Sequence, residues 1–260
     1  MALKKLRVKN GYTILEAAVV LTIIGLLIGS IIVGQTLIRS AKMYAVSMDI
    51  GIYLGAVKDF QDKYKALPGD MPDAENFWGS DTTCPATPFT ASPHVPTCNG
   101  DGNGFIDGTT EPFRAWQQLA NSGFISGAYT GVAGSAGANQ HVRGINSPKT
   151  MLDGGGFDLF YIGNMSGDVN YYGGYYPLKL GLGTATATGA FDKPLFTPGE
   201  ALAIDSKLDD GAPGTGNIMA FKSPINPGCA TTDVSTTAVY AISGTNFLCS
   251  LNIIIPDPFK

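Results

Sequence analysis

Two hydrophobic patterns follow each other in the first quarter of the chain. Residues 17–38 carry no charge, and these 22 residues match the ~20 that a helix needs to cross a bilayer. Beyond them, apolar side chains recur every three to four positions, as on one face of an amphipathic helix. These are Ile38, Ala41, Ala45, Met48, Ile52, Ala56 and Phe60. The Leu-Pro-Gly sequence at 67–69 ends the pattern, which predicts one helix over 12–66, apolar over 12–38 and amphipathic over 39–66.

Short elements separated by Gly-rich loops are predicted after this helix. Helices are expected at 70–79, with Asp70 as the N-cap, at 111–121, and after the capping box Thr-Pro-Gly-Glu at 197–200. The runs that predict strands are 157–162, 175–182, 217–222, 238–243 and 247–255. No repeating strand–helix–strand pattern occurs, so an α/β fold around a parallel sheet is not expected.

Charge is distributed unevenly along the 260 residues. Residues 1–11 hold Lys4, Lys5, Arg7 and Lys9 and no acid. The formal net charge is −4, from 17 basic and 21 acidic residues, so the chain beyond this basic end has 13 basic residues and a charge of −8. Such an acidic chain gives no reason to expect nucleic-acid binding. With 34 Gly, 16 Pro and 15% charged residues, the composition fits an exported, loop-rich protein.

Two common interpretations of the apolar run leave features unexplained. A secretory signal peptide has a shorter apolar core followed by a small-x-small cleavage site, and no A-x-A site follows here. An ordinary membrane anchor fits the length and the basic flank. It does not explain the carboxylate of Glu16, because an unpaired acid at the edge of a membrane segment is costly.

The sequence KKLRVKNG at 4–11, followed by YTILE at 12–16 and the apolar run, resembles the type IV prepilin signal. In that family a membrane peptidase cuts after the Gly, methylates the new N-terminal residue, and leaves a Glu at the fifth mature position. The resemblance implies cleavage between Gly11 and Tyr12, N-methylation of Tyr12, and a role for Glu16 in assembly. The family usually has Phe where this chain has Tyr12, a change that keeps size and apolarity. LPGDMPDAENFWG, CNGDGNGFID and DSKLDDGAPGTGN also resemble a subgroup of large bacterial proteins with this signal.

This resemblance implies a structural subunit, a type IV pilin or a type II secretion pseudopilin. Its fold would be an α+β pilin-like roll, with the long N-terminal helix packed on an antiparallel sheet. A cleaved leader at 1–11 and the helix at 12–66 would precede a globular head at 67–260. The chain would sit in the bacterial inner membrane before it enters a periplasmic or cell-surface filament. Its partners would be copies of itself or other pilin-like subunits, prepilin peptidase and the inner-membrane assembly platform.

A loop rich in Asn, Asp and Gly is the strongest candidate for a metal site in the head. Its sequence NGDGNGFID at 99–107 begins like an EF-hand loop, with Asn at the first position and Gly104 at the bend. The twelfth position is Thr110, so the full motif fails. Calcium is still predicted, with Asn99, Asp101, Asn103, the Phe105 carbonyl, Asp107 and Glu111 as ligands. The alternative for this loop is an Asx/Gly turn without an ion. If the loop does bind calcium, the alternative to a filament subunit is a membrane-anchored, calcium-dependent binding or adhesion module.

The remaining chemistry is sparse. The four Cys are Cys84, Cys98, Cys229 and Cys249, and two local disulfides are favoured among three possible pairings. No Cys lies in a C-x-x-C motif or a Cys/His cluster, so zinc is not expected. The acids of the segment 205–210 predict a solvated turn rather than a second ion site or a subunit contact. No catalytic triad or pair of acids is evident, and we expect no enzymatic activity.

Overall fold

The computed structural model describes residues 13–82, 84, 96–186 and 189–256. Helix α1 runs over Ile14–Tyr64, which confirms the long N-terminal helix. It ends where Lys65 adopts a φ of 57°. Contacts divide the chain into two compact units with the boundary between Lys42 and Met43, so the second half of α1 belongs to the same unit as the head.

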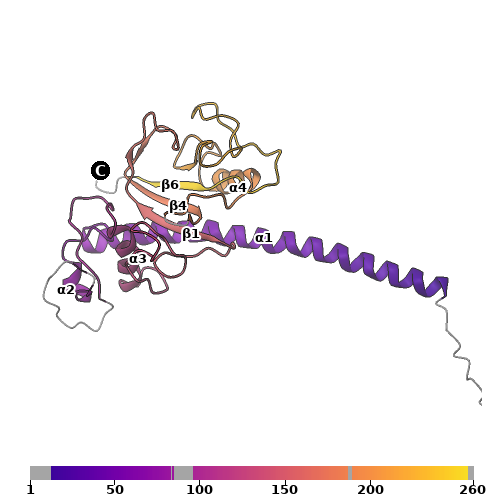
Figure 1. Ribbon diagram of the computed structural model, residues 1–260, viewed down its shortest axis with the longest axis horizontal. Helices are drawn as coiled ribbons and strands as arrows, with labels where there is room; N and C mark the ends of the chain where they lie inside the picture. The colour runs from indigo at the N-terminus through magenta and orange to yellow at the C-terminus, as the bar shows by residue number, and fades with distance from the viewer. Residues whose placement is uncertain (1–12, 83, 85–95, 187–188, 257–260) are drawn as a thin grey trace, which may run out of the picture. The chain divides into compact units, whose positions relative to one another are not determined.

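The head is built around a four-stranded antiparallel sheet (Figure 1). Its strands, in spatial order, are β1 (Gly155–Phe160), β4 (Leu178–Thr184), β6 (Leu251–Ile255) and β5 (Ile218–Ala220). Strands β2 (Gly163–Asn164) and β3 (Tyr175–Tyr176) pair in a small second sheet. The protein is therefore α+β, with a long apolar N-terminal helix and an antiparallel sheet.

Two of the expected strands differ from those observed. The run 175–182 is divided between β3 and β4 at Pro177, which has no N–H to donate to a ladder. The run 238–243 forms no strand, and Tyr240 makes only an isolated bridge to Ala230. This segment buries Ala238 and Tyr240 and exposes Val239 and Ile242, an alternation that pattern alone does not distinguish from that of a strand.

One face of the sheet forms the main core against α1. Leu182 lies opposite Phe157, and Leu180 opposite Leu159, so these side chains share a face. The ring of Tyr53 on α1 lies 4.9 Å from that of Phe157 and 5.2 Å from that of Trp116 on α3 (Glu111–Asn121). The buried residues of α1 include Val46, Ile50, Val57 and Phe60. The amphipathic half of the helix thus covers the sheet, but the predicted apolar face is wrong in part: Ala56 and Phe60 are buried, whereas Met48 and Ile52 are 51% and 50% exposed.

The opposite face of the sheet is polar and covered by loops. It carries Asp158, Lys179 and Asn252, each at most 1% exposed. Phe191 lies over this face, where a side chain on Gly156 would overlap its ring. Helix α2 (Ala74–Trp78) and helix α4 (Pro198–Leu208) complete the described helices.

Both local disulfides are present, which confirms the expected pairs. Cys84 is bonded to Cys98, and Cys229 to Cys249. The first joins Cys84, which follows α2 in the chain, to Cys98, and the second fixes the segment that leads into β6.

Candidate functional site

The N-terminus of α1 is closed by a capping box that the sequence analysis missed. The Glu16 carboxylate accepts hydrogen bonds from the Thr13 N–H (2.8 Å) and the Thr13 hydroxyl (2.9 Å). In return, the Glu16 N–H donates to Oγ1 of Thr13 at 3.2 Å. The T-x-x-E spacing before an apolar run is the sequence signal for this motif. Glu16 is thus a helix cap as well as the predicted assembly residue, whereas Gly11 and Tyr12 lie outside the described residues.

The helix that follows this cap exposes its apolar side chains. Leu21, Leu26 and Val33 are 69%, 73% and 67% exposed. The most apolar part of the helix has a mean hydropathy of 2.6, with none of it buried. This one helix is long and apolar enough to cross a membrane.

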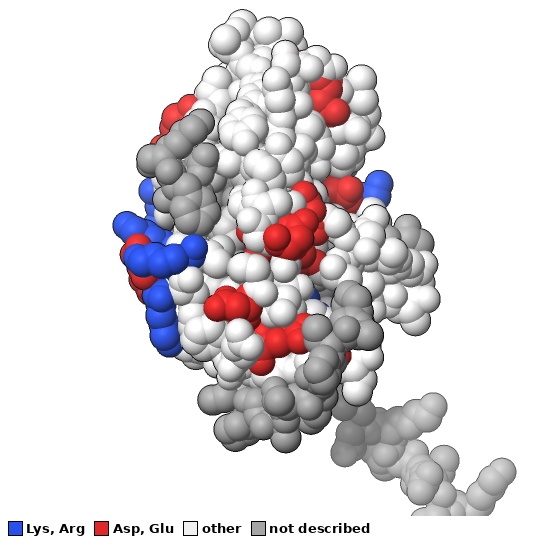
Figure 2. Space-filling model, turned by 90° about the vertical axis from the view of Figure 1, so that its left-hand side faces the viewer, with Lys and Arg blue, Asp and Glu red and all other residues white. Residues whose placement is uncertain are grey.

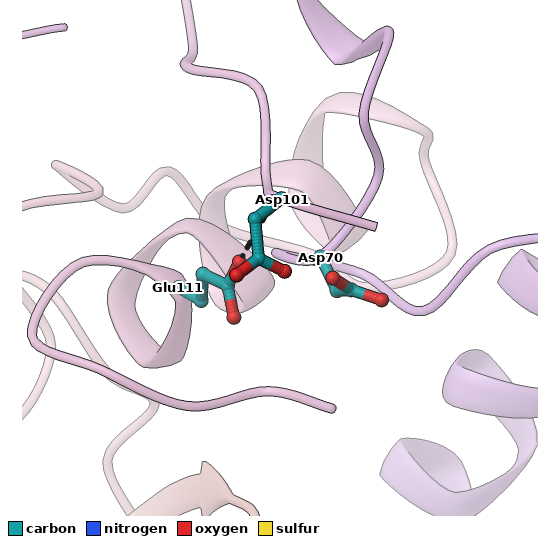
Figure 3. Close-up of side chains that lie close together, drawn as sticks. All are labelled: Asp70, Asp101 and Glu111. Carbon is teal, nitrogen blue, oxygen red and sulfur yellow. Dashed lines mark hydrogen bonds between the residues drawn. The ribbon is translucent and has the colours of Figure 1, made fainter. Parts of the chain in front are cut away.

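Three carboxylates meet in the head, from three segments distant in sequence (Figure 3). Asp70 follows the end of α1, Asp101 lies in the loop after Cys98, and Glu111 opens α3. One oxygen from each lies within 4.8 Å of the others. Gly100 makes this approach possible, because any side chain there would overlap the backbone of Asp70. The fold therefore gathers hard oxygen ligands of the kind that calcium prefers.

These carboxylates also hold the loop in shape. Asp70 accepts from the N–H groups of Asn103 (3.0 Å) and Gly104 (2.9 Å). Glu111 accepts from the N–H groups of Asp101 (3.1 Å) and Asp107 (3.0 Å). Each carboxylate oxygen keeps a second lone pair after it accepts one such hydrogen bond. These oxygens can therefore also coordinate a cation.

The predicted ligand set is met only in part. Asp101 and Glu111 lie together as expected. The third acid beside them is Asp70, which was predicted as the N-cap of the helix at 70–79. The N-cap of α2 is Asp73. The Asn99 side chain accepts from the Glu75 N–H, and the Asn103 side-chain oxygen accepts from the Phe105 N–H. Oδ2 of Asp107 accepts a hydrogen bond from the side-chain nitrogen Nδ2 of Asn103 at 3.4 Å.

Phe105 is predicted to contribute its backbone carbonyl rather than its side chain. Its ring packs on that of Tyr161 at 4.2 Å, so it secures the loop to the sheet. Asp70 lies about thirty positions from the loop, and no local motif marks it. Only the tertiary approach of the two segments makes Asp70 part of the cluster.

Burial makes negative charge costly in this cluster. Burial raises the pKa of Asp70 to about 6, although the amides of Gly104 and Asn103 oppose the rise. Burial also raises the pKa of Glu111 to about 7, with the charges of Asp70 and Asp101 adding to the rise. A bound cation would relieve both the repulsion and the lost hydration. Figure 2 shows Asp and Glu side chains over the end of the head that faces the viewer, with Lys and Arg gathered mainly along one margin.

The acidic segment at the end of α4 is a hydrogen-bonded turn that is partly solvated, with Asp205 buried, Asp209 half-buried and Asp210 exposed. Asp205 is buried and accepts from the Tyr240 hydroxyl (2.8 Å) and the Gly211 N–H (2.9 Å). Asp209 accepts from the Ile218 N–H at 2.9 Å, and Asp210 accepts from the Thr215 hydroxyl at 2.6 Å. The three acids lie together, but each has a structural partner that explains its place.

Comparison with protein-family models, with curated proteins and with solved structures found no match. The assignment of function therefore rests on the residues and geometry described above.

Proposed function

We propose that this protein is a structural subunit of a type IV pilus or type II secretion filament, inserted in the inner membrane and assembled after removal of its leader. The observation that carries the proposal is the exposed apolar half of α1, with a single carboxylate, Glu16, in its first turn. An apolar surface of this length requires lipid or other apolar helices around it.

The cap at the start of α1 explains how Glu16 is tolerated before assembly. The N–H and the hydroxyl of Thr13 both donate hydrogen bonds to the Glu16 carboxylate. These bonds replace part of its hydration and so lower the free-energy cost of placing it near lipid. Cleavage after Gly11 would create an ammonium on Tyr12. In a filament the Glu16 carboxylate would pair with the Tyr12 ammonium of a neighbouring subunit, and that pair would set the axial register.

The charge of Glu16 and its cap can be separated by substitution. Glu16→Gln keeps a side chain that a capping box accepts, and removes the charge. Thr13→Ala weakens the cap and keeps the charge. We expect Glu16→Gln to insert in the membrane and fail to form filaments, while Thr13→Ala still assembles. Normal filaments from Glu16→Gln, seen by electron microscopy of sheared cell-surface or periplasmic fractions, would refute the ion-pair role.

Processing separates the filament subunit from a simple membrane anchor. Mass spectrometry of the mature N-terminus should find N-methyl-Tyr12. A retained Met1, with no filament association, would instead favour the membrane-anchored binding or adhesion module. This result does not depend on whether the head binds calcium.

Calcium binding to the head is a second proposal, favoured by the cluster of Asp70, Asp101 and Glu111. These carboxylates supply oxygen ligands and buried negative charge, and extracellular calcium near millimolar suffices for a weak site. Binding would lock the 99–107 loop against α3. The proposal is compatible with either the filament subunit or the anchored module.

Thermal unfolding of the full chain in detergent, with and without millimolar calcium, tests this site. A ligand that binds only the folded state raises the unfolding temperature. Asp101→Asn should abolish that rise. Asp210→Asn makes the same chemical change in the other acidic segment and should retain it. No calcium-dependent rise in the wild-type chain would refute the site.

A further inference from the structure

Lys179 and Asp158 meet on the polar face of the sheet, away from α1. Both side chains are 0% exposed, and Nζ lies 3.1 Å from Oδ1. The two residues are diagonal neighbours on adjacent strands, because Asp158 is opposite Gly181 and Lys179 is opposite Phe160. A side chain on Gly181 would overlap Oδ1 and would lie 2.7 Å from Nζ. The glycine thus leaves the space in which the two groups meet.

The contact lacks the hydrogen bonds that usually support a buried ion pair. Among the described residues, neither Nζ of Lys179 nor Oδ1 of Asp158 has a hydrogen-bond partner. Only Oδ2 of Asp158 is bonded, by the Phe191 N–H at 2.8 Å. An ammonium has three donors, and burial of a charge is repaid only when such groups are satisfied. Burial opposes the Lys179 ammonium, and the Asp158 carboxylate outweighs that effect and raises the pKa of Lys179, so the pair is held, within the described part of the chain, without the further hydrogen bonds that would complete it.

Aromatic rings close the site to solvent. Nζ of Lys179 lies 4.2 Å from the ring centre of Phe160 and 5.5 Å from that of Phe221. The rings attract the cation, but their main effect at zero exposure is to exclude bulk water. A dry pocket raises the free energy of two ions far more than that of a neutral amide.

A second carboxyl group completes the cluster. Oδ1 of Asp192 is buried and has no hydrogen-bond partner among the described residues. Asp192 interacts electrostatically with both Lys179 and Asp158, and burial raises the pKa of its carboxyl. The Ser250 hydroxyl holds its backbone by donating to the Asp192 carbonyl at 2.6 Å. The N–H that bonds Oδ2 of Asp158 belongs to Phe191, the residue before Asp192, so the chain at Asp192 lies beside the pair and its carboxyl is the nearby acid that can carry a proton.

We propose that Lys179 and Asp158 condense to form an amide crosslink between β4 and β1, with Asp192 as the proton carrier. The ammonium of Lys179 first gives a proton to the Asp158 carboxylate, which leaves a neutral amine and a carboxylic acid. The Nζ lone pair attacks Cγ of Asp158, and the new C–N bond forms. The C–O bond of the acid hydroxyl then breaks, and Asp192 carries the second proton from Nζ to this oxygen, which leaves as water. The products are one amide and one water, and no oxidant or other reactant is needed.

The bond would join strands that the sheet already pairs. It would enclose β2, β3 and the connecting loops in a covalent ring, as the disulfides do for other loops of the head. Reducing agents would not open it. The crosslink would form only in the folded chain, since only folding brings the two side chains together and excludes water.

Peptide mapping of the full wild-type chain, purified in detergent, tests the proposal. Trypsin cuts after Lys149 and Lys207, whereas Lys193 precedes a Pro and resists cleavage. An unmodified chain gives separate peptides 150–179 and 180–207. A crosslinked Lys179 blocks cleavage, so the expected product is one peptide 150–207 that has lost the mass of a water. Separate peptides of full mass from the folded protein would overturn the proposal.

Two variants test the roles within the cluster. Lys179→Arg keeps a cation but cannot form the amide, so its peptides should be separate and of full mass. Asp192→Asn keeps the size of the proton carrier and removes its acidity, so the folded variant should retain a free Lys179. A complete crosslink in Asp192→Asn would overturn the assignment of Asp192, and a water loss in Lys179→Arg would overturn that of Lys179.

Discussion

The buried carboxyl of Asp205 should make the head more stable in mild acid. Its pKa is raised from 3.8 to about 6, chiefly by burial and against the hydrogen bond from Tyr240. Between these two values the folded state holds a proton that the unfolded state has released. Stability contributed by this group therefore rises as pH falls through about 6, and levels off below the unfolded value of 3.8.

The size of the effect follows from the two pKa values. Between pH 7 and pH 5 the folded carboxyl takes up almost one proton, and the unfolded one takes up almost none. Since one pKa unit corresponds to about 1.4 kcal/mol, the gain over this interval is about 1.3 kcal/mol. Asp70 and Glu111 shift in the same direction, so the wild-type profile also contains their contributions.

Urea unfolding of the full chain in detergent measures this gain. The buried Trp78 and Trp116 provide a fluorescence signal from the head. Asp205→Asn preserves size and removes the titration, so the difference between wild type and variant isolates Asp205. That difference should change by about 1.3 kcal/mol between pH 7 and pH 5.

A second variant tests the cause of the shift. Tyr240→Phe removes a hydrogen bond that favours the ionised carboxylate, so the pKa of Asp205 should rise further. Its stabilisation in acid should then begin at higher pH than in the wild type. A difference between wild type and Asp205→Asn that stays constant from pH 7 to pH 5 would refute the linkage.

Three further stability changes should appear in the same urea assay. Thr197→Ala removes one half of the capping box with Glu200 and should cost about 1 kcal/mol, whereas Thr186→Ala, which caps no helix, should cost less. Gly181→Ala places a methyl group against Asp158 and Lys179 and should cost about 1–3 kcal/mol; an unchanged midpoint would contradict the close packing. Replacing Cys229 and Cys249 together by Ser should cost about 3 kcal/mol, and equal stability of variant and wild type would show that this crosslink does not constrain the unfolded chain.

The sequence predicts best where one local rule decides the structure. The apolar run and its amphipathic continuation fix α1 within two residues at each end. The Thr-Pro-Gly-Glu capping box starts α4 at Pro198, and Gly108 and Pro112 surround the start of α3 at Glu111. The capping boxes at Thr13 and Thr197 start α1 and α4, and the Pro in the first turn starts α3, which has no side-chain cap.

Features that depend on tertiary approach were not predicted. Asp70 joins Asp101 and Glu111 only because Gly100, which has no side chain, lets its loop pack against the backbone of Asp70. Lys179 reads as a solvent-facing position on an alternating strand, yet loops bury it completely. The T-x-x-E spacing at 13–16, by contrast, is a local signal that predicts the cap at Glu16.

The order of strands has a consequence for the timing of folding. Among the described strands, β6 is last in the sequence, yet it lies between β4 and β5 in the sheet. During translation, β5 has no sheet neighbour until residues 251–255 have left the ribosome. The sheet therefore cannot close on a partly synthesised chain. A messenger truncated before codon 251 would yield a product that exposes two unpaired strand edges and should be a substrate for proteolysis.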